Sequence, residues 1–317
     1  MRPRLRFGLV CDMDNPPSPS SFSQVSPAQG RLLIALAAIL WSTSGAFNKI
    51  LTGQTFLGLD TPEIQPLQIA FGRVLFAGMV LVPTVRRRDI TFRPMMIAMA
   101  VSFAIMNGTF IWAMSVGTAA NAIVLQYTAP MWMYLASVCW LGEAADRRNL
   151  AALALGLVGI SVIFAGGWQG GQLKVVVIAL ISGLGFAAVM IFLRVLRDAS
   201  SRWLTVVNHV FGALALLPLI VSLPLPSPAQ IAFLFLYGAV QMGIPYWLVA
   251  RGLRSVSPQE AGTITLLEPI LNPLWAFLVV AEVPSKFELV GGGFILGALA
   301  WRYWPLRNRL PVGRDQG

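Results

Sequence analysis

The segment PQEAGTITLLEPILNPLWAFLVVAE, residues 258–282, repeats an earlier segment of the same chain, AANAIVLQYTAPMWMYLASVCWLGE at residues 119–143. The two segments align without a gap at an offset of 139 residues. The positions that are identical at this offset include Ala122 with Ala261, Pro130 with Pro269, Glu143 with Glu282, and Leu150 with Leu289. Such a duplication predicts a chain made of two related halves.

The composition places both halves in a membrane. Of the 317 residues, 56% are hydrophobic and only 11% are charged, whereas a soluble domain carries about a quarter charged residues. A window of about 19 residues finds candidate spans at approximately 32–52, 66–85, 94–114, 119–141, 149–166, 173–194, 203–223, 229–250, 258–281 and 286–304. We therefore predict an all-α membrane protein with ten transmembrane helices, because these runs are too long for buried strands of a soluble α/β protein.

The basic residues indicate how the spans are oriented. The net charge is +10, and 19 of the 23 Lys and Arg lie in the two tails or in alternate short loops, such as 86–88 and 147–148. Loops rich in Lys and Arg stay in the cytoplasm. We therefore expect a multi-pass protein of the inner (plasma) membrane with both termini cytoplasmic. The pattern is a topology signal, so no nucleic-acid partner is expected.

The division of the chain follows from the span count. We expect a disordered cytoplasmic tail (1–30), a first five-helix repeat (31–166), a second five-helix repeat (173–304) and a cytoplasmic tail (305–317). Met13 is an alternative start to Met1. Because five is odd, the second repeat enters the membrane in the opposite direction to the first. The predicted architecture is thus two inverted five-helix repeats.

Short motifs in both halves resemble those of a known family. They are Trp41–Gly45, Arg73, Ala119–Ala122, Ala129–Pro130 and Leu141–Glu143 in the first half, and Leu267–Pro269 and Ala281–Glu282 in the second. Together they resemble the EamA-like transporters of the drug/metabolite transporter superfamily, from about residue 31 to 304. The resemblance implies a central cavity between the halves and a secondary transporter that exports amino acids or other small metabolites by alternating access. One departure is Ala281, where the family usually has Gly.

Two charged residues inside spans are the first candidates for a substrate site. Glu268 and Arg73 lie about ten and twelve residues from the cytoplasmic ends of their spans. At about 1.5 Å per residue, their depths agree within a few ångströms. A charge at this depth is costly, so each requires a function or a partner. Glu268 is expected to bind a substrate amine, carry a proton or bond to neighbouring helices, and Arg73 to pair with an acid, cap carbonyls or face the cavity.

Other candidates are prolines and polar or aromatic residues within spans. Pro130 and Pro269 occupy equivalent positions of the two halves, where each is expected to kink its helix beside the cavity. The remaining candidates for substrate binding or gating are Asn48, Asn107, Tyr127, Gln241, Tyr246 and Trp41. Each alternatively bonds helix to helix. The same alternative is favoured for Asn208 and His209 in the span 203–223.

Rival functions lack their motifs. An intramembrane enzyme needs convergent acids, a metal cluster or a nucleophile with a base, but the spans hold one deep acid and the chain has one histidine. A channel needs a filter-like segment, which is absent from the sequence. We expect no enzyme activity, no cofactor and no metal. The partners expected are a small-molecule substrate, lipid and, as an alternative coupling ion, protons. Import rather than export, and a monomer or a homodimer, stay open.

Overall fold

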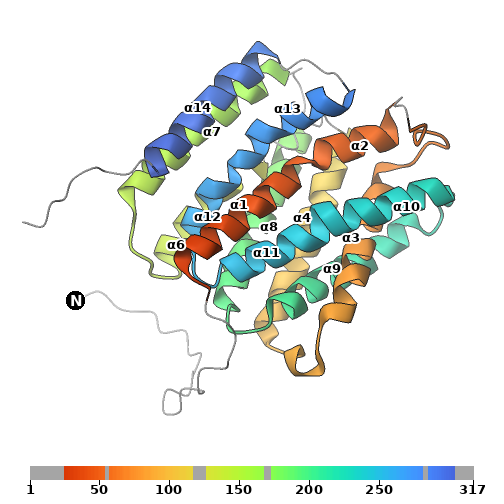
Figure 1. The fold of residues 1–317 in the computed structure, drawn as a ribbon, viewed down its shortest axis with the longest axis horizontal. Helices are drawn as coiled ribbons and strands as arrows, with labels where there is room; N and C mark the ends of the chain where they lie inside the picture. Colours follow the sequence, from red (N-terminus) through yellow and green to blue (C-terminus); the bar gives the residue numbers. More distant parts are fainter. Residues whose placement is uncertain (1–24, 54–56, 117–125, 168–172, 281–284, 304–317) are drawn as a thin grey trace, which may run out of the picture.

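The computed structural model describes residues 25–53, 57–116, 126–167, 173–280 and 285–303, and over these ranges its regular structure is helical, without a strand (Figure 1). The α-helices are α1 (Pro27–Ser42), α2 (Ser44–Thr52), α3 (Pro66–Leu81), α4 (Pro94–Val116), α6 (Ala129–Cys139), α7 (Arg147–Gly167), α8 (Leu173–Val195), α9 (Ser201–Ile220), α10 (Pro228–Tyr237), α11 (Ile244–Gly252), α12 (Pro258–Thr265), α13 (Leu267–Val280) and α14 (Lys286–Tyr303). Two 3-10 turns, η1 (Val82–Thr84) and η2 (Arg87–Asp89), and a π-helix, η3 (Gly238–Gly243), complete the described structure. The motif residues 119–122 and 281–282 lie outside the described residues.

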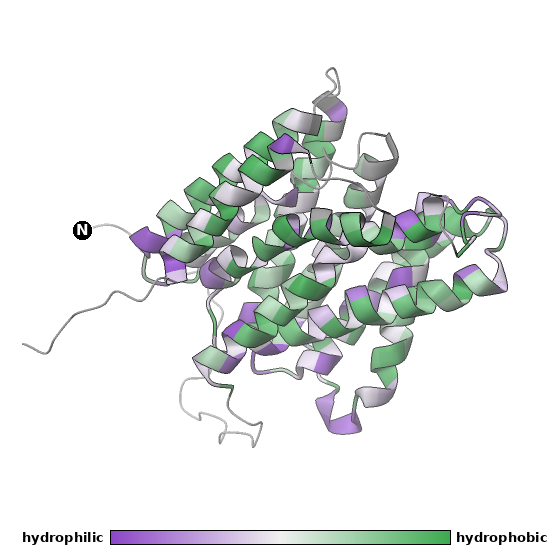
Figure 2. Ribbon diagram, turned by 45° about the horizontal axis from the view of Figure 1, so that its top comes forward, coloured by the Kyte–Doolittle hydropathy of each residue, from purple (hydrophilic) through white to green (hydrophobic). Residues whose placement is uncertain are grey.

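The helices are those of a membrane protein. Within the described residues, seven segments are long and apolar enough to cross a bilayer: Pro27–Thr52, Pro66–Thr84, Arg147–Gly166, Val176–Val195, Ser201–Ile220, Pro228–Gly252 and Pro258–Val279. Shorter apolar helices cover Pro94–Phe110, Ala129–Cys139 and Leu289–Tyr303. Large apolar side chains such as Leu214 and Leu278 are exposed, and hydrophilic residues lie mainly at helix ends and in loops (Figure 2). Such a large exposed apolar surface is unfavourable in water and favourable in lipid. The prediction of an all-α membrane fold is therefore confirmed.

Local sequence explains where several helices begin. Ser26 and Ser227 each form a capping box with the glutamine three residues later, and a proline follows each serine at the start of α1 and α10. Ser257 accepts a hydrogen bond from the backbone N–H of Glu260, and Pro258 opens α12. A serine cap satisfies an otherwise unpaired N–H, and proline fits the first helical position because its missing N–H is not needed there.

Two of the long segments are broken near their middle. The first is interrupted at Thr43, between α1 and α2, and another at Leu266, between α12 and α13. Pro269 lies in the first turn of α13 and Pro130 in the first turn of α6. A proline there removes no intrahelical hydrogen bond. The expected mid-helix kinks are thus helix starts, at positions that correspond under the offset of 139.

Helices from distant parts of the chain pack in pairs. Helix α7 lies along α14, α4 along α8, α3 along α9, and α1 along α11 (Figure 1). Helix α6 packs against α12 and α8, and α13 packs against α1. The α7–α14 contact is a backbone contact, because a Cβ on Gly159 would lie 2.5 Å from the carbonyl oxygen of Gly291. Small residues that allow such close approach stabilise helix pairs in lipid.

Charged side chains connect the helices at one end of the molecule. Arg31 of α1 pairs with Glu260 of α12 at 2.8 Å, and Arg302 of α14 pairs with Asp146 at 3.1 Å. Arg194 of α8 pairs with Glu143 at 3.3 Å. All six are residues that the charge pattern assigns to the cytoplasmic side. Since Arg302 also lies 3.8 Å from Glu260, the first two pairs form one network, and Arg194–Glu143 is a separate pair.

Candidate functional site

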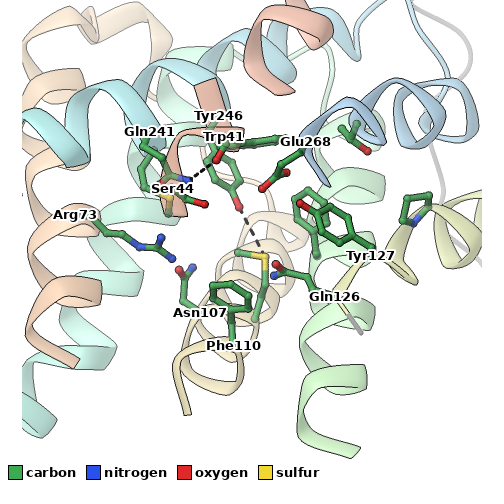
Figure 3. A pocket seen from close by; sticks show the side chains of 15 residues that line it. Trp41, Ser44, Arg73, Asn107, Phe110, Gln126, Tyr127, Gln241, Tyr246 and Glu268 are labelled. Atoms are coloured by element: carbon green, nitrogen blue, oxygen red, sulfur yellow. Dashed lines mark hydrogen bonds between the residues drawn. The ribbon is translucent and has the colours of Figure 1, made fainter. Parts of the chain in front are cut away.

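A cavity lies where the broken helices and the π-helix meet (Figure 3). From the first half of the chain it is lined by Trp41, Ser44, Arg73, Met106, Asn107, Phe110, Gln126, Tyr127 and Pro130. From the second half it is lined by Phe186, Gln241, Met242, Tyr246, Thr265 and Glu268. Its volume of about 60 Å³ is enough for a few water molecules or one small polar group. Both halves thus contribute side chains to one cavity.

Arg73 projects from α3 into this cavity. Its side chain is 8% exposed, and its buried Nε has no hydrogen-bond partner. The guanidinium carbon lies 5.8 Å from the centre of the Tyr237 ring, a cation–π distance. Among the described residues Arg73 forms no ion pair. A buried guanidinium without an acid partner is unfavourable, so this position requires a compensating group.

Glu268 enters the same cavity from the other side. It is half-buried in the first turn of α13, where a negative charge complements the positive end of the helix dipole. Its carboxylate lies beside the Tyr127 ring in Figure 3, and the Tyr127 hydroxyl is buried without a hydrogen-bond partner of standard geometry. No ion pair joins Glu268 to Arg73 within the described structure. The structure thus places Glu268 and Arg73 in one cavity rather than in an ion pair with each other.

The π-helix η3 positions a third polar group. Gln241 is 4% exposed, its Nε2 donates weakly to the carbonyl oxygen of Trp41 at 3.5 Å, and its Oε1 has no partner. A π-helical turn shifts the side chains that follow it relative to an α-helix and is frequent at functional sites. Here it brings Gln241 to the cavity wall opposite Asn107 (Figure 3). An amide with a free acceptor is therefore available to a bound molecule.

Aromatic rings form the apolar part of the wall. The Trp41 ring meets Phe186 edge to face at 5.6 Å and Tyr246 at 5.1 Å. Within the described residues, the Tyr246 hydroxyl donates a hydrogen bond to the sulfur of Met106, at 3.7 Å. Such rings suit the apolar portion of a small molecule. The cavity thus combines a cation, an anion, amides and an aromatic surface.

The structure brings together most of the candidates from the sequence. Arg73, Glu268, Asn107, Tyr127, Gln241, Tyr246, Trp41 and Pro130 all line the cavity. Pro269 and Asn48 do not: Pro269 is buried beside Glu268, and Asn48 is half-buried on α2. Sequence reasoning missed Ser44, Met106, Phe110, Phe186, Met242 and Thr265 as lining residues. Apolar or hydroxyl residues in a span give no signal that separates a cavity wall from helix packing.

Asn208 and His209 lie behind the cavity wall and are fully buried. The His209 ring contacts Phe103 at 5.0 Å and Tyr246 at 5.3 Å, and its Nδ1 bonds to the Thr205 carbonyl of its own helix at 2.7 Å. Within the described residues, neither His209 Nε2 nor the side-chain amide of Asn208 has a hydrogen-bond partner. The favoured interpretation of interhelical hydrogen bonds is therefore wrong for these atoms.

No group of three or more His, Cys, Asp or Glu that could hold a metal occurs within the described residues. Glu268 is the one acidic side chain of the cavity wall. The arrangement can therefore bind and orient a small molecule through charge and hydrogen bonds.

These features define a polytopic α-helical membrane protein with a polar cavity between its two halves. The chain belongs to the EamA-like transporter family, whose model matches it twice, at residues 28–165 and 173–303. An uncharacterized transporter of Archaeoglobus fulgidus is 27% identical over 86% of this chain and 96% of its own length. An uncharacterized transporter of Bacillus subtilis, YwfM, is 24% identical over 82% and 88%.

A solved crystal structure shares the fold. It superposes with a TM-score of 0.77 over 90% of this chain and 100% of that chain, at 17% sequence identity. Its title, "Crystal structure of protein", names no activity. The protein is therefore a membrane transporter by family, and the relatives carry the names of transporters rather than of enzymes.

Proposed function

We propose that the protein is a secondary transporter that exports amino acids or related small metabolites by alternating access, and that it has no enzymatic activity. The observation that carries the proposal is the cavity itself. It receives a guanidinium from the first half and a carboxylate from the second, and these two groups do not pair with each other. Amino acids carry the complementary charges.

The proposed architecture is ten membrane helices in two inverted repeats, 31–166 and 173–304. The packing supports it, because the main contacts are preserved when each helix is exchanged for its counterpart in the other half. The α4–α8 contact then becomes the α11–α1 contact, and the α6–α8 contact becomes α13–α1, while α7–α14 and α3–α9 map onto themselves. In transporters built from inverted repeats, broken helices at the repeat interface surround the substrate. Pro130 and Pro269 mark two such breaks.

The proposed topology places the ion-pair network of Arg31, Glu260, Arg302 and Asp146 on the cytoplasmic side, with both termini and in the inner (plasma) membrane. The basic loops support this orientation. Opening the cavity to the cytoplasm requires the helix ends on that side to separate. We therefore assign these ion pairs to the closed cytoplasmic end of the transport cycle.

Glu268 is proposed as the group that binds the substrate amine or, alternatively, carries a proton. Glu268 is half-buried, and the Tyr127 hydroxyl beside it has no hydrogen-bond partner of standard geometry. Either role makes transport depend on the charge of this one side chain. Asn107, Gln241, Tyr246 and Trp41 are proposed as the remaining contacts of the substrate.

Transport by the purified protein tests the proposal. Proteoliposomes are assayed for counterflow and efflux of a labelled panel of amino acids and related metabolites, with and without a pH gradient. Saturation and exchange are expected of a carrier, whereas a channel shows neither. Glu268→Gln should abolish or strongly reduce transport, and Glu63→Gln, an exposed acid outside the cavity, should behave like the wild type. Unchanged rate and pH dependence in Glu268→Gln would refute its role, and absence of saturable flux would refute the function.

A further inference from the structure

We infer that Arg73 is the receptor for the carboxylate of the substrate, which restricts the transported class to zwitterions and excludes purely cationic amines. The inference rests on the proposed function and deepens it. Glu268 alone would favour any amine-bearing solute. Arg73 adds a second requirement at the opposite side of the same cavity (Figure 3).

The guanidinium of Arg73 is buried and lacks an acid partner within the described residues. Arg73 is 8% exposed, its Nε is buried without a hydrogen-bond partner, and within the described residues it forms no ion pair. An arginine that only stabilised the fold would neutralise an acid or cap carbonyl groups. A buried guanidinium that lacks an acid partner and has an unpaired Nε is unfavourable unless a ligand completes it.

Contacts with Tyr237 and with the backbone of η3 hold Arg73 in place. The Tyr237 ring lies against the guanidinium, with 5.8 Å between the guanidinium carbon and the ring centre. The Tyr237 hydroxyl donates to the Ser44 carbonyl at 3.2 Å, which anchors the ring. At Gly238 a Cβ would lie 2.6 Å from the Arg73 carbonyl oxygen, so α3 and η3 are in backbone contact. A preorganised guanidinium needs less ordering to bind an anion.

The groups around the guanidinium are complementary to an amino acid. Asn107 and Gln241 line the cavity on either side of the guanidinium in Figure 3. Arginine binds carboxylates through two parallel N–H···O bonds. A carboxylate at Arg73 leaves the attached ammonium directed toward Glu268 and an apolar side chain against Trp41 and Phe186. Each group of an α-amino acid therefore has a complement in the cavity wall, and a whole amino acid requires the cavity to widen beyond its volume of about 60 Å³ in this structure.

The test pairs one change in the ligand with one change in the protein. The full-length protein in detergent is titrated with the standard amino acids, and binding is measured by thermal stabilisation. The amino acid that stabilises most is then compared with its own amide, which lacks the carboxylate and keeps the ammonium. The same pair is measured on Arg73→Gln, on Arg73→Lys and on Lys174→Gln, which removes an exposed positive charge outside the cavity.

The expected result is a selective loss. In the wild type the amide should bind roughly 10- to 100-fold more weakly than the amino acid, as for a lost charged hydrogen bond. Arg73→Gln should weaken the amino acid by a similar factor and leave the amide unchanged, Arg73→Lys should fall between, and Lys174→Gln should match the wild type. The ratio of the two ligands is taken within one preparation, so a smaller folded fraction does not alter it.

Two further outcomes are distinguishable. If an amino acid is bound and transported in counterflow but its amide binds equally well, or Arg73→Gln weakens both ligands equally, the carboxylate role is wrong and the transport function stands. If no amino acid is bound or transported, the proposed function itself fails and the inference fails with it.

Discussion

A methyl group added at Gly291 should separate α7 from α14. A Cβ at this position would contact the carbonyl oxygen of Gly159 and would lie 2.5 Å from Cγ1 and 3.2 Å from the backbone nitrogen of Ile163. Because the first contact is to backbone, the helices themselves must move. Gly293, two residues further along α14, has no atom within 4 Å of the same added Cβ. It therefore provides a matched control.

The size of the effect follows from comparing the two variants. Replacing Gly by Ala gains about 1 kcal/mol of helix propensity at either site. This gain cancels between Gly291→Ala and Gly293→Ala, which leaves the overpacking term of about 1–3 kcal/mol. With roughly 2–4 °C per kcal/mol for chains of this order of size, Gly291→Ala should melt several degrees below Gly293→Ala.

The assay is thermal unfolding of the detergent-purified variants, followed by the loss of the monodisperse peak in size-exclusion chromatography at one heating rate. A melting temperature of Gly291→Ala equal to or above that of Gly293→Ala would refute the backbone contact between α7 and α14. It would also remove one of the contacts that map onto themselves in the proposed exchange of halves.

Two further predictions concern the end of the molecule that carries the ion pairs. Asn149 is fully buried, donates to the Gln259 carbonyl and accepts from Thr263 and Arg302, so Asn149→Ala should lose about 2–4 kcal/mol of stability through unpaired groups; an equal melting temperature for Asn149→Ala and the wild type would contradict this. Glu260→Gln removes the charge that faces Arg31 and Arg302 and should cost only about 1 kcal/mol. Its effect should shrink between roughly 0.1 and 1 M salt, and a loss independent of salt would show that the pairs act by another means.

The composition alone predicted the class of membrane protein, because helices that contact lipid require long runs of hydrophobic residues. Most of the candidate site could also be predicted from the sequence. Charged or polar side chains such as Arg73, Glu268 and Gln241 are rare in spans, and all three line one cavity. The same reasoning was wrong for Asn48, which lies on α2 and does not line the cavity. A polar residue in a span indicates that something must satisfy it, but not which face of the helix it occupies.

Other features depend on tertiary packing that local sequence does not record. The π-helix over Gly238–Gly243 rests on a backbone contact with α3, where a Cβ at Gly238 would lie 2.6 Å from the Arg73 carbonyl. Pro130 and Pro269 were expected to bend continuous helices, yet they start new ones. Proline chemistry permits both outcomes, and the surrounding helices determine which occurs. The lining residues Met106 and Phe186 resemble ordinary core residues for the same reason.

Thiol labelling at Ser44 tests whether the cavity is the substrate site of an alternating-access cycle. Ser44 lines the cavity, whereas Cys139 is exposed outside it. Ser44→Cys is placed in a background without Cys11 and Cys139, and a second protein keeps Cys139 alone. Labelling by a membrane-impermeant thiol reagent is measured from each side of the membrane, with and without the transported amino acid. We predict that the amino acid slows labelling at Ser44→Cys and that the reagent labels this position from both sides of the membrane during turnover. Labelling of Cys139 should be unaffected by the amino acid. Labelling of Ser44→Cys that is insensitive to the amino acid, or confined to one side throughout turnover, would contradict this prediction.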